Sequence, residues 1–222
     1  MKQTPVHEMH NDHLLALMPR QARRIVEVGS SSGALARAFK ELHSDCYYTG
    51  IEIDADYAEL SKRHCDCVIH ASVEELQDSA FDALFPSDCW VFADSLEHLY
   101  DPWNLLRRIR GRIAAGSSVV ACIPNAQHWT VQTRLNSGLF RYEDAGLLDR
   151  THIRWFTKLT IREMFESTGF TIVEGGGRIY DEPGRDEVLE AIRYMAETIH
   201  ADPEQAVNDA IPFQWIIRAE AI

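Results

Sequence analysis

The stretch Arg24–Gly33, RIVEVGSSSG, decides the fold of this 222-residue chain. An apolar, β-branched run leads into a turn of small residues, and the helix-forming segment ALARAFKEL follows at once. A strand, a tight turn and a helix in this order are typical of the first unit of an α/β sheet. Gly29 and Gly33 allow a sharp turn and leave no side chain between the backbone and a ligand. The first N–H groups of the helix would face that ligand.

Glu27 precedes this turn and limits what the ligand can be. A carboxylate at that place repels phosphate groups and favours a ligand that carries positive charge or hydroxyl and amine donors. The dinucleotide-binding pattern G-x-G-x-x-G is also absent, because three serines separate Gly29 from Gly33. The turn therefore predicts a ligand site of a different kind from a dinucleotide site.

The composition is that of an ordinary globular protein, with 45% hydrophobic and 25% charged residues, and the length suits one domain over residues 1–222. A net charge of −12 argues against nucleic acid and anionic membrane surfaces as partners. No apolar run reaches the ~20 residues of a membrane span, and residues 1–13 lack the apolar core of a secretory signal.

Five cysteines without framework spacing fit a reducing compartment, so we expect a cytoplasmic protein. His64, Cys65 and Cys67 stand close together in the sequence, as metal ligands often do. We expect the two cysteines to be small buried residues and assign no metal there.

Strand-like and helix-like segments alternate through the first half of the chain. Apolar runs predict strands at 24–28, 46–54, 65–72, 88–99 (with its polar loop) and 117–125, and helical spacing predicts helices at 11–19, 34–42, 55–64, 73–78 and 101–116. This alternation predicts a doubly wound α/β fold, with a parallel sheet, helices on both faces and right-handed crossovers.

The second half of the chain departs from this pattern. Residues 126–157 are mixed, polar and aromatic, and they are too many for a plain connection, so we expect a lid or substrate-binding insertion. The segments that follow predict a helix at 158–170, a strand at 170–180, a helical insertion at about 184–210 and a closing strand at 211–221.

The ends of the first strands are where a doubly wound sheet binds its ligand. Glu52 ends the second strand and is the first choice for binding two vicinal ribose hydroxyls, with Asp54 as the alternative. The segments EVGSSSG, GIEID and DSLEHLYDP resemble class I S-adenosylmethionine-dependent methyltransferases, and the similarity covers nearly the whole chain. This resemblance implies a Rossmann-like, seven-stranded sheet with an antiparallel last strand, and S-adenosylmethionine as the cofactor.

The resemblance also implies a set of cofactor-binding residues. From the methionine end of the cofactor through its ribose to its adenine they are Glu27, Gly29, Ser31, Gly33, Glu52, Ile53, Ser72 and Val73, with Asp94 beside the reactive methyl group. Two of them depart from the family pattern, since Ser31 stands where a glycine is usual and Ser72 where a carboxylate is usual.

The identity of the acceptor rests on the segment GLLDRTHIRWFT, residues 146–157. It resembles a bacterial subgroup often encoded with glycan or polysaccharide biosynthesis, which implies a small-molecule acceptor, a hydroxyl of a sugar or glycan precursor. The run Asp94–His98 resembles one in ubiquinone-type O-methyltransferases, where it is associated with a divalent metal, so a quinol or phenol acceptor stays open. A cofactor-binding but inactive scaffold is the remaining alternative.

Methyl transfer needs an aligned nucleophile and often a base that removes its proton. Histidine titrates near neutral pH, and the candidates for the base are His152, His98 and His128. We assign no metal ligand.

Three further residues are candidates for binding the acceptor. Arg150 and Arg154 suit an anionic group such as a phosphate, and Trp129 belongs to the aromatic part of the lid. A homodimer is one option for the assembly.

Overall fold

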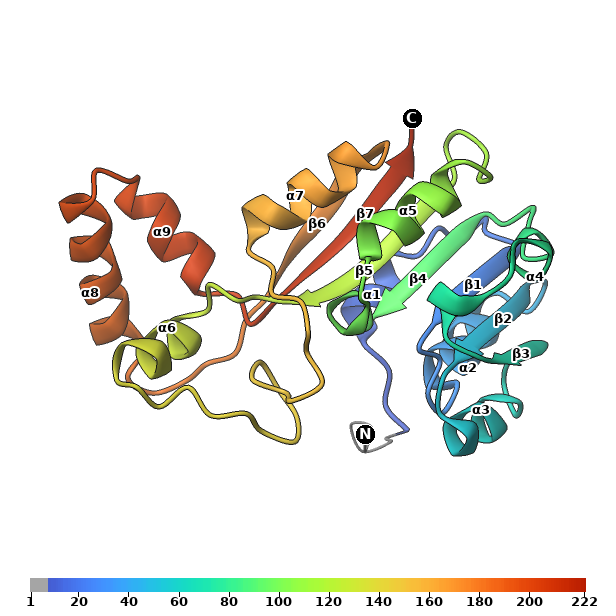
Figure 1. The fold of residues 1–222 in the computed structure, drawn as a ribbon, viewed down its shortest axis with the longest axis horizontal. Helices are drawn as coiled ribbons and strands as arrows, with labels where there is room; N and C mark the ends of the chain where they lie inside the picture. The colour runs from blue at the N-terminus through green and yellow to red at the C-terminus, as the bar shows by residue number, and fades with distance from the viewer. Residues whose placement is uncertain (1–7) are drawn as a thin grey trace.

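The computed structural model describes residues 8–222, so part of the N-terminal segment 1–13, for which no secretory signal was expected, lies outside the described residues. A seven-stranded sheet in the order β3-β2-β1-β4-β5-β7-β6 forms the centre of the molecule (Figure 1). Its strands are β1 Arg24–Val28, β2 Tyr47–Glu52, β3 Cys67–His70, β4 Cys89–Ala93, β5 Ser118–Pro124, β6 Phe170–Arg178 and β7 Gln214–Ala221. The first five strands pair in parallel, and β7 is antiparallel to both of its neighbours. The predicted fold, including the antiparallel last strand, is confirmed.

Alternation along the strands gives the sheet two separate cores, because successive side chains point to opposite faces. On one face Ile25 packs with Leu35 and Phe39. On the other face Val26 belongs to the core that contains Leu105. The helices of the first face are α1 Asp12–Leu17 and α2 Ala34–Leu42, and those of the second are α5 Pro102–Arg110 and α7 Lys158–Ser167. Helices therefore cover both faces, as predicted.

Short elements complete the first half of the chain. They are α3 Ala55–Ser61, α4 Asp78–Asp82 and two 3-10 turns, η1 Val73–Glu75 and η2 Leu96–His98. The Asp54 side chain accepts the N–H groups of Asp56 and Tyr57, at 2.9 and 3.1 Å, and so caps α3. The turn η2 begins three residues after β4 ends, so the position of β4 determines where Glu97 and His98 stand.

The helical insertion forms a small unit of its own at one end of the sheet, on the left of Figure 1. It consists of α6 Trp129–Asn136, α8 Arg185–Thr198 and α9 Pro203–Ala210. The core of this unit contains Trp129, Leu189, Ile192, Val207 and Ala210. The helix α6 was not expected within the lid, because its sequence WTVQTRLN contains β-branched and polar residues with little helical preference. Packing of Trp129 against α8 stabilises this helix, which the helical preference of its own residues would not do.

Within residues 8–222 no helix is long and apolar enough to cross a membrane. All five cysteines lie in this part of the chain and carry free thiols. Cys65 is buried and its sulfur lies 3.2 Å from the Ser61 hydroxyl, as expected for a small core residue.

Gly50 in β2 controls the position of the turn after β1. A Cβ atom at residue 50 would lie 2.5 Å from Oγ and 2.8 Å from Cβ of Ser30, whose hydroxyl accepts a hydrogen bond from buried Ser61 at 2.8 Å. We expect Gly50→Ala to displace the turn and to lower the free energy of unfolding by about 1–3 kcal/mol, measured by urea denaturation.

The matched control is Gly176→Ala in β6, where an added Cβ meets nothing within 4 Å. The double variant Gly50→Ala, Ser30→Gly removes the side chain that clashes and should recover part of the loss. If Gly50→Ala and Gly176→Ala lowered the free energy of unfolding equally, close contact with Ser30 would not be the cause.

Candidate active site

A cavity of about 700 Å³ opens beyond the C-terminal ends of β1, β2 and β4, where the order of the strands reverses. Its walls come from the turn after β1, the ends of β2 and β4, residues 71–75, the lid and the N-terminal residues 9–11. Every predicted cofactor residue except Gly33 lines this cavity. Gly33 instead stands at the N-terminus of α2, directly beneath the turn.

The turn after β1 has an unusual backbone. Gly29, Ser31 and Gly33 all have positive φ, at 79°, 47° and 76°. A side chain at Gly29 would bring its Cβ to 3.3 Å from Cβ of Ser95, so the turn and the loop after β4 approach closely. Ser31 adopts a conformation that favours glycine, which explains why glycine is usual at this position in the family that the sequence resembles.

The carboxylate of Glu52 ties this turn to the end of β2. Its two oxygens accept the N–H groups of Ser31 and Asp54, both at 2.9 Å, and the side chain is buried but lines the cavity. Asp54, the alternative for the ribose hydroxyls, is engaged as the cap of α3 and is not among the lining residues. The geometry therefore presents Glu52, and not Asp54, to a ligand.

Glu27 is a buried acid in the same cavity. Its Oε2 accepts a hydrogen bond from the Tyr48 hydroxyl at 3.1 Å. Burial raises the pKa of Glu27 from 4.5 to about 8, the Tyr48 hydrogen bond lowers it, and the nearby Glu52 carboxylate raises it further. Below pH 8 the free protein holds Glu27 mainly in its neutral form.

The remaining predicted cofactor residues differ in exposure. Ile53 is 57% exposed, whereas Val73 is buried beside Ser72 at the start of η1. Asp94 has a positive φ of 55°, and its Oδ1 accepts hydrogen bonds from the Gln214 side-chain amide and, at 3.4 Å, from the Cys122 thiol. Contacts from β7 and β5 thus hold Asp94 at the cavity wall.

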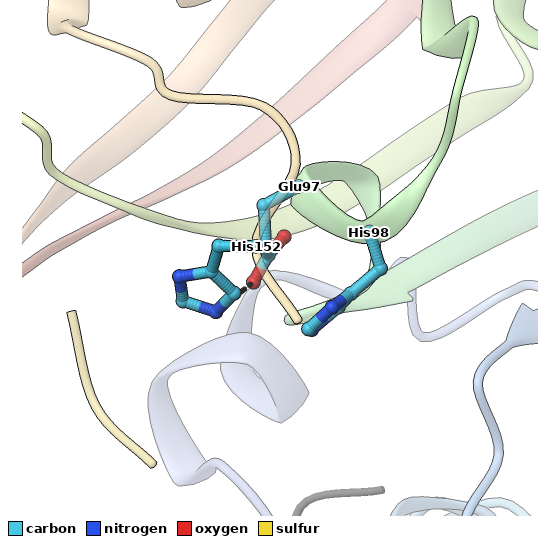
Figure 2. A group of neighbouring side chains, drawn as sticks. All are labelled: Glu97, His98 and His152. Carbon is cyan, nitrogen blue, oxygen red and sulfur yellow. Dashed lines mark ion pairs between the residues drawn. The ribbon is translucent and has the colours of Figure 1, made fainter. Parts of the chain in front are cut away.

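A group of three side chains stands at the lid side of the cavity (Figure 2). Glu97 and His98 belong to η2 and His152 to the lid, and one ligand atom from each lies within 4.8 Å of the others. His152 Nε2 is 3.9 Å from Glu97 Oε1, and the two imidazole centroids are 4.9 Å apart. The structure thus brings together two of the three predicted bases.

Backbone carbonyls fix the tautomers of both histidines. His98 Nδ1 lies 3.0 Å from the Thr151 carbonyl oxygen, and His152 Nδ1 lies 3.1 Å from that of Leu147. A carbonyl oxygen only accepts, so each Nδ1 donates its hydrogen and each Nε2 keeps a free lone pair. Both rings can therefore act as a base or as a ligand through Nε2.

Burial favours the neutral forms of Glu97 and His152. Burial raises the pKa of Glu97 well above its usual value, and the Asp94 carboxylate raises it further. Burial also lowers the pKa of His152, and neighbouring His98 lowers it further. Both shifts favour a contact between a neutral acid and a neutral imidazole over an ion pair.

The lid is held on η2 by its backbone. The N–H groups of Ile153 and Arg154 both donate to the Glu97 carbonyl oxygen, each at 3.0 Å. The guanidinium of Arg154 donates to the Tyr100 carbonyl oxygen, at 3.1 Å through Nε. These bonds place residues 151–154 against the loop that follows β4.

The predicted acceptor-binding residues have other partners. Arg150 lines the cavity, but its guanidinium pairs with Asp144 at 2.6 Å. Arg154 binds the Tyr100 carbonyl as described above, and Trp129 is buried in the core of the helical insertion. Contacts within the chain thus account for all three side chains in this structure.

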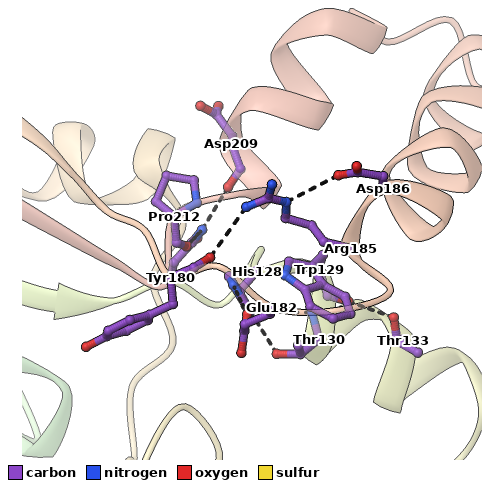
Figure 3. A network of polar contacts seen from close by, with 11 residues as sticks. His128, Trp129, Thr130, Thr133, Tyr180, Glu182, Arg185, Asp186, Asp209 and Pro212 are labelled. Atoms are coloured by element: carbon purple, nitrogen blue, oxygen red, sulfur yellow. Dashed lines mark hydrogen bonds and ion pairs between the residues drawn. The ribbon is translucent and has the colours of Figure 1, made fainter.

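His128 stands apart from the other two histidines, in the polar network of Figure 3. It caps α6, its Nδ1 lies 2.8 Å from the Thr130 hydroxyl, and its Nε2 lies 3.6 Å from Glu182 Oε2. Burial lowers the pKa of His128 to about 4. It does not line the cavity, and its contacts are those of a helix cap.

Sequence reasoning did not single out Glu97, Leu147 and Gln214. Glu97 is 1% exposed and neither of its oxygens has a hydrogen-bond partner among residues 8–222. One feature of the sequence could have indicated Glu97: it follows shortly after a predicted strand. In a doubly wound sheet the residues after the C-terminal ends of the strands lie on the ligand side. No local signal marks Gln214, which reaches the site from β7.

The fold and the cavity define a class first: a Rossmann-like sheet with an acidic cavity at the reversal of strand order, suited to a cationic nucleoside cofactor. A family model described as a methyltransferase domain matches residues 7–175. The chain belongs to this family, and it is a class I methyltransferase that uses S-adenosylmethionine, as its sequence predicted. No curated protein sequence matches the chain significantly.

Solved structures share the fold at low sequence identity. Magnesium protoporphyrin IX methyltransferase from Synechocystis, solved with S-adenosylhomocysteine, is 11% identical, with a TM-score of 0.59 over 94% of this chain and 78% of that chain. An S-adenosylmethionine-dependent methyltransferase from Mesorhizobium loti is 17% identical, with a TM-score of 0.60 over 93% and 95%. An O-methyltransferase of neocarzinostatin biosynthesis, solved with S-adenosylhomocysteine and 1,4-dihydroxy-2-naphthoic acid, is 14% identical, with a TM-score of 0.52 over 89% and 49%.

The raised pKa of Glu27 predicts a pH-dependent stability. Between pH 4.5 and about 8 the unfolded chain has lost this proton and the folded chain retains it, so the free energy of unfolding falls as pH rises through this window. The decline is at most about 1.4 kcal/mol per pH unit.

Glu27→Gln retains an acceptor for Tyr48 and removes the titration. Urea unfolding from pH 5 to 9 should therefore show a shallower decline for this variant than for the wild-type protein. Parallel pH profiles of the two proteins would contradict a buried, neutral Glu27.

Proposed function

We propose that this methyltransferase transfers the methyl group of S-adenosylmethionine to a hydroxyl of a small-molecule acceptor, a sugar or glycan precursor. One observation carries the proposal: the imidazole and carboxyl groups of His98, His152 and Glu97 line the same cavity as the turn after β1. An acceptor hydroxyl among these groups would stand beside the place where the fold holds the cofactor's methyl group.

The lining of the cavity fits the cofactor. Glu27 and Glu52 offer carboxyl groups to a ligand whose sulfonium and ammonium groups are positive and whose ribose carries two hydroxyls. Gly29 has no side chain, and a Cβ atom there would lie close to Ser95, so the backbone of the turn is exposed to the ligand. When bound, S-adenosylmethionine supplies an electrophilic methyl group on a positively charged sulfur.

In this proposal each part of the chain has a distinct task. Glu27 loses its proton as it binds the ammonium group, and Glu52 accepts the ribose hydroxyls. Leu147 and Ile153 of the lid, together with Phe213, reduce the water around the sulfonium, whose charge disappears in the reaction. The cluster of Glu97, His98 and His152 activates the acceptor hydroxyl.

Two kinds of observation support a hydroxyl-rich acceptor. The lid contributes polar groups to the cavity, among them Asp149 and Thr151, and Gln214 adds an amide from β7. The lid segment GLLDRTHIRWFT also resembles a subgroup linked to glycan biosynthesis. A cytoplasmic location and a homodimer remain part of the proposal.

A quinol or phenol acceptor is the second candidate. The apolar residues Leu147, Ile153 and Phe213 favour it, since a flat ring would pack against them. One assay separates the candidates: the protein is incubated with S-adenosylmethionine and either nucleotide-linked and phosphorylated sugars or quinols and catechols, and methylated products are detected by mass spectrometry. We expect methylation of the sugars. Methylation of the phenolic compounds alone would overturn the sugar assignment, and cofactor binding without any product would favour the scaffold.

The two carboxylates at the end of β2 make a matched pair for testing the cofactor assignment. Glu52→Ala removes charge-assisted hydrogen bonds worth about 1.5–3 kcal/mol to the ribose, so the Kd for S-adenosylhomocysteine in calorimetry should rise about ten- to hundredfold. Asp54→Ala removes the cap of α3 and should cost about 1 kcal/mol of stability with the Kd unchanged. A Kd that rises only in the Asp54 variant would reverse the assignment.

A further inference from the structure

We propose that the free edge of β6 pairs with β6 of a second copy of this chain, in antiparallel direction and about a two-fold axis at Gly176. The two sheets then continue into each other across this edge. The proposal specifies an interface for the homodimer named in the proposed function, and it rests on that part alone. It requires no assumption about the acceptor or the cofactor.

The sheet has two edge strands, and they differ in length. β3 has four residues, whereas β6 has nine. Native proteins often avoid pairing with another chain by keeping an edge strand very short. Residues 173–177 of β6 are all exposed. The longer edge strand is therefore accessible to another strand.

The pairing with β7 shows which backbone groups of β6 are free. In an antiparallel pair, a residue directs both its N–H and its C=O toward the neighbouring strand or away from it, and the two kinds alternate. The Arg178 carbonyl accepts the N–H of Phe213 at 2.8 Å, so Arg178 and, two residues before it, Gly176 face β7. Gly175 and Gly177 consequently direct their N–H and C=O groups away from the sheet, and no other element within residues 8–222 bonds to these groups.

A two-fold axis at Gly176 uses these free groups. It places Gly176 opposite its own copy, and Gly175 of each chain opposite Gly177 of the other. Each of these two pairs exchanges two N–H···O bonds, as hydrogen-bonded pairs of an antiparallel ladder do. The backbone groups that point away from β7 thereby gain partners.

The charges on β6 are complementary in the same register. Glu174 and Arg178 stand two residues before and after Gly176, so each lies opposite the other in the second copy. Facing opposite charges stabilise an antiparallel pair, and facing like charges destabilise it. Glu174 pairs with Arg218 at 3.1 Å, but its side chain remains 56% exposed and can accept a second guanidinium. An axis moved by one residue would bring neither charge opposite the other.

The register also covers apolar side chains that are exposed in the single chain. Val173 is 46% exposed and Ile179 is 55% exposed. They stand three residues before and after Gly176, so they too lie opposite each other, and covering them favours association. Val173 is a bulge in the pairing with β7, so regular pairing beyond it is interrupted and the interface is short. We therefore expect a dimer that dissociates on dilution.

The first test measures the mass of the full chain by sedimentation over a series of protein concentrations. The wild-type protein should have the mass of two chains at high concentration and of one chain on dilution. Glu174→Arg and Arg178→Glu each place like charges opposite each other at two points, so each should raise the dissociation constant about tenfold or more. The double variant exchanges the two charges and should recover most of the association.

A mixture of the two single variants is the sharpest form of this test. Every facing pair of a mixed dimer has opposite charges, so the mixture should associate at concentrations where neither variant does alone. Glu187→Arg is the matched control, because Glu187 is exposed on α8 and lies outside β6. Mass is measured rather than activity, since Arg178 also donates to Gln214, which binds Asp94 in the cavity.

A disulfide tests the register without a change of charge. Two residues that face each other without exchanging hydrogen bonds have Cα atoms about 4.5 Å apart, within the range of about 4.4–6.8 Å that a disulfide spans. A Cβ atom at residue 176 meets nothing within 4 Å, so Gly176→Cys has room for its thiol. Mild oxidation should link two chains of this variant. Thr171→Cys on the same strand, five residues from the axis, should give no more linkage than the wild-type protein.

Circular dichroism and binding of S-adenosylhomocysteine show whether each variant is folded. A wild-type mass of one chain at every concentration would overturn the proposal, as would equal linkage through Gly176→Cys and Thr171→Cys. A monomer that methylates a hydroxyl acceptor would leave the proposed reaction standing. A dimer through β6 without methylation of any hydroxyl acceptor would uphold the interface and overturn that reaction.

Discussion

The arrangement of the active site depends on a single carbonyl oxygen, that of Glu97, which accepts two N–H groups of the lid at 3.0 Å each. Together with the contact of His98 with the Thr151 carbonyl and the bond from Arg154 to the Tyr100 carbonyl, these bonds hold residues 151–154 beside the sheet, where His152 meets His98. The Glu97 carbonyl stands in η2, directly after β4, and β4 is a fully paired central strand. The sheet thereby fixes the position of the lid, which contains little regular structure of its own.

Burial of carboxyl groups is the second constraint on the cavity. Glu27 and Glu97 stand in different parts of it, and burial raises the pKa of both, which favours the protonated form of each in the free protein. A cation that approaches either group would displace its proton and gain a strong partner in a medium of low polarity. The two acids therefore favour positively charged ligands, which agrees with the sulfonium and ammonium groups of S-adenosylmethionine.

The cofactor side of the site could be predicted from the sequence, and the acceptor side only in part. Glu27, Gly29 and Glu52 stand at the ends of strands, and apolar runs reveal strands and hence their ends. The meeting of His98 with His152 depends on backbone bonds between distant segments, which no local pattern records. Arg150 illustrates the same limit, because a sequence does not show that Asp144 already pairs with its charge.

The helix α6 shows why the helical insertion could be found but not its full extent. Residues 185–198 have clear helical spacing and were predicted as a helix, whereas α6 gains its stability by packing Trp129 against α8 after the chain has folded. His128 and Trp129 were assigned to chemistry because they lie in the lid segment, but Trp129 packs in the core of the insertion unit and His128 is the buried cap of α6. Residue type alone does not separate a reactive histidine from a buried helix cap, since the difference lies in what surrounds the ring.

Backbone bonds, rather than side-chain pairs, anchor the central contacts of the lid. The bonds from Ile153 and Arg154 to Glu97, and the carbonyls of Leu147 and Thr151 that orient the imidazoles, involve main-chain atoms on the lid side. Such bonds survive a change of lid side chain as long as the chain path is kept. The position of His152 is thus set separately from the residues that would select an acceptor. The same scaffold can therefore keep its reactive cluster while the lining contributed by the lid changes.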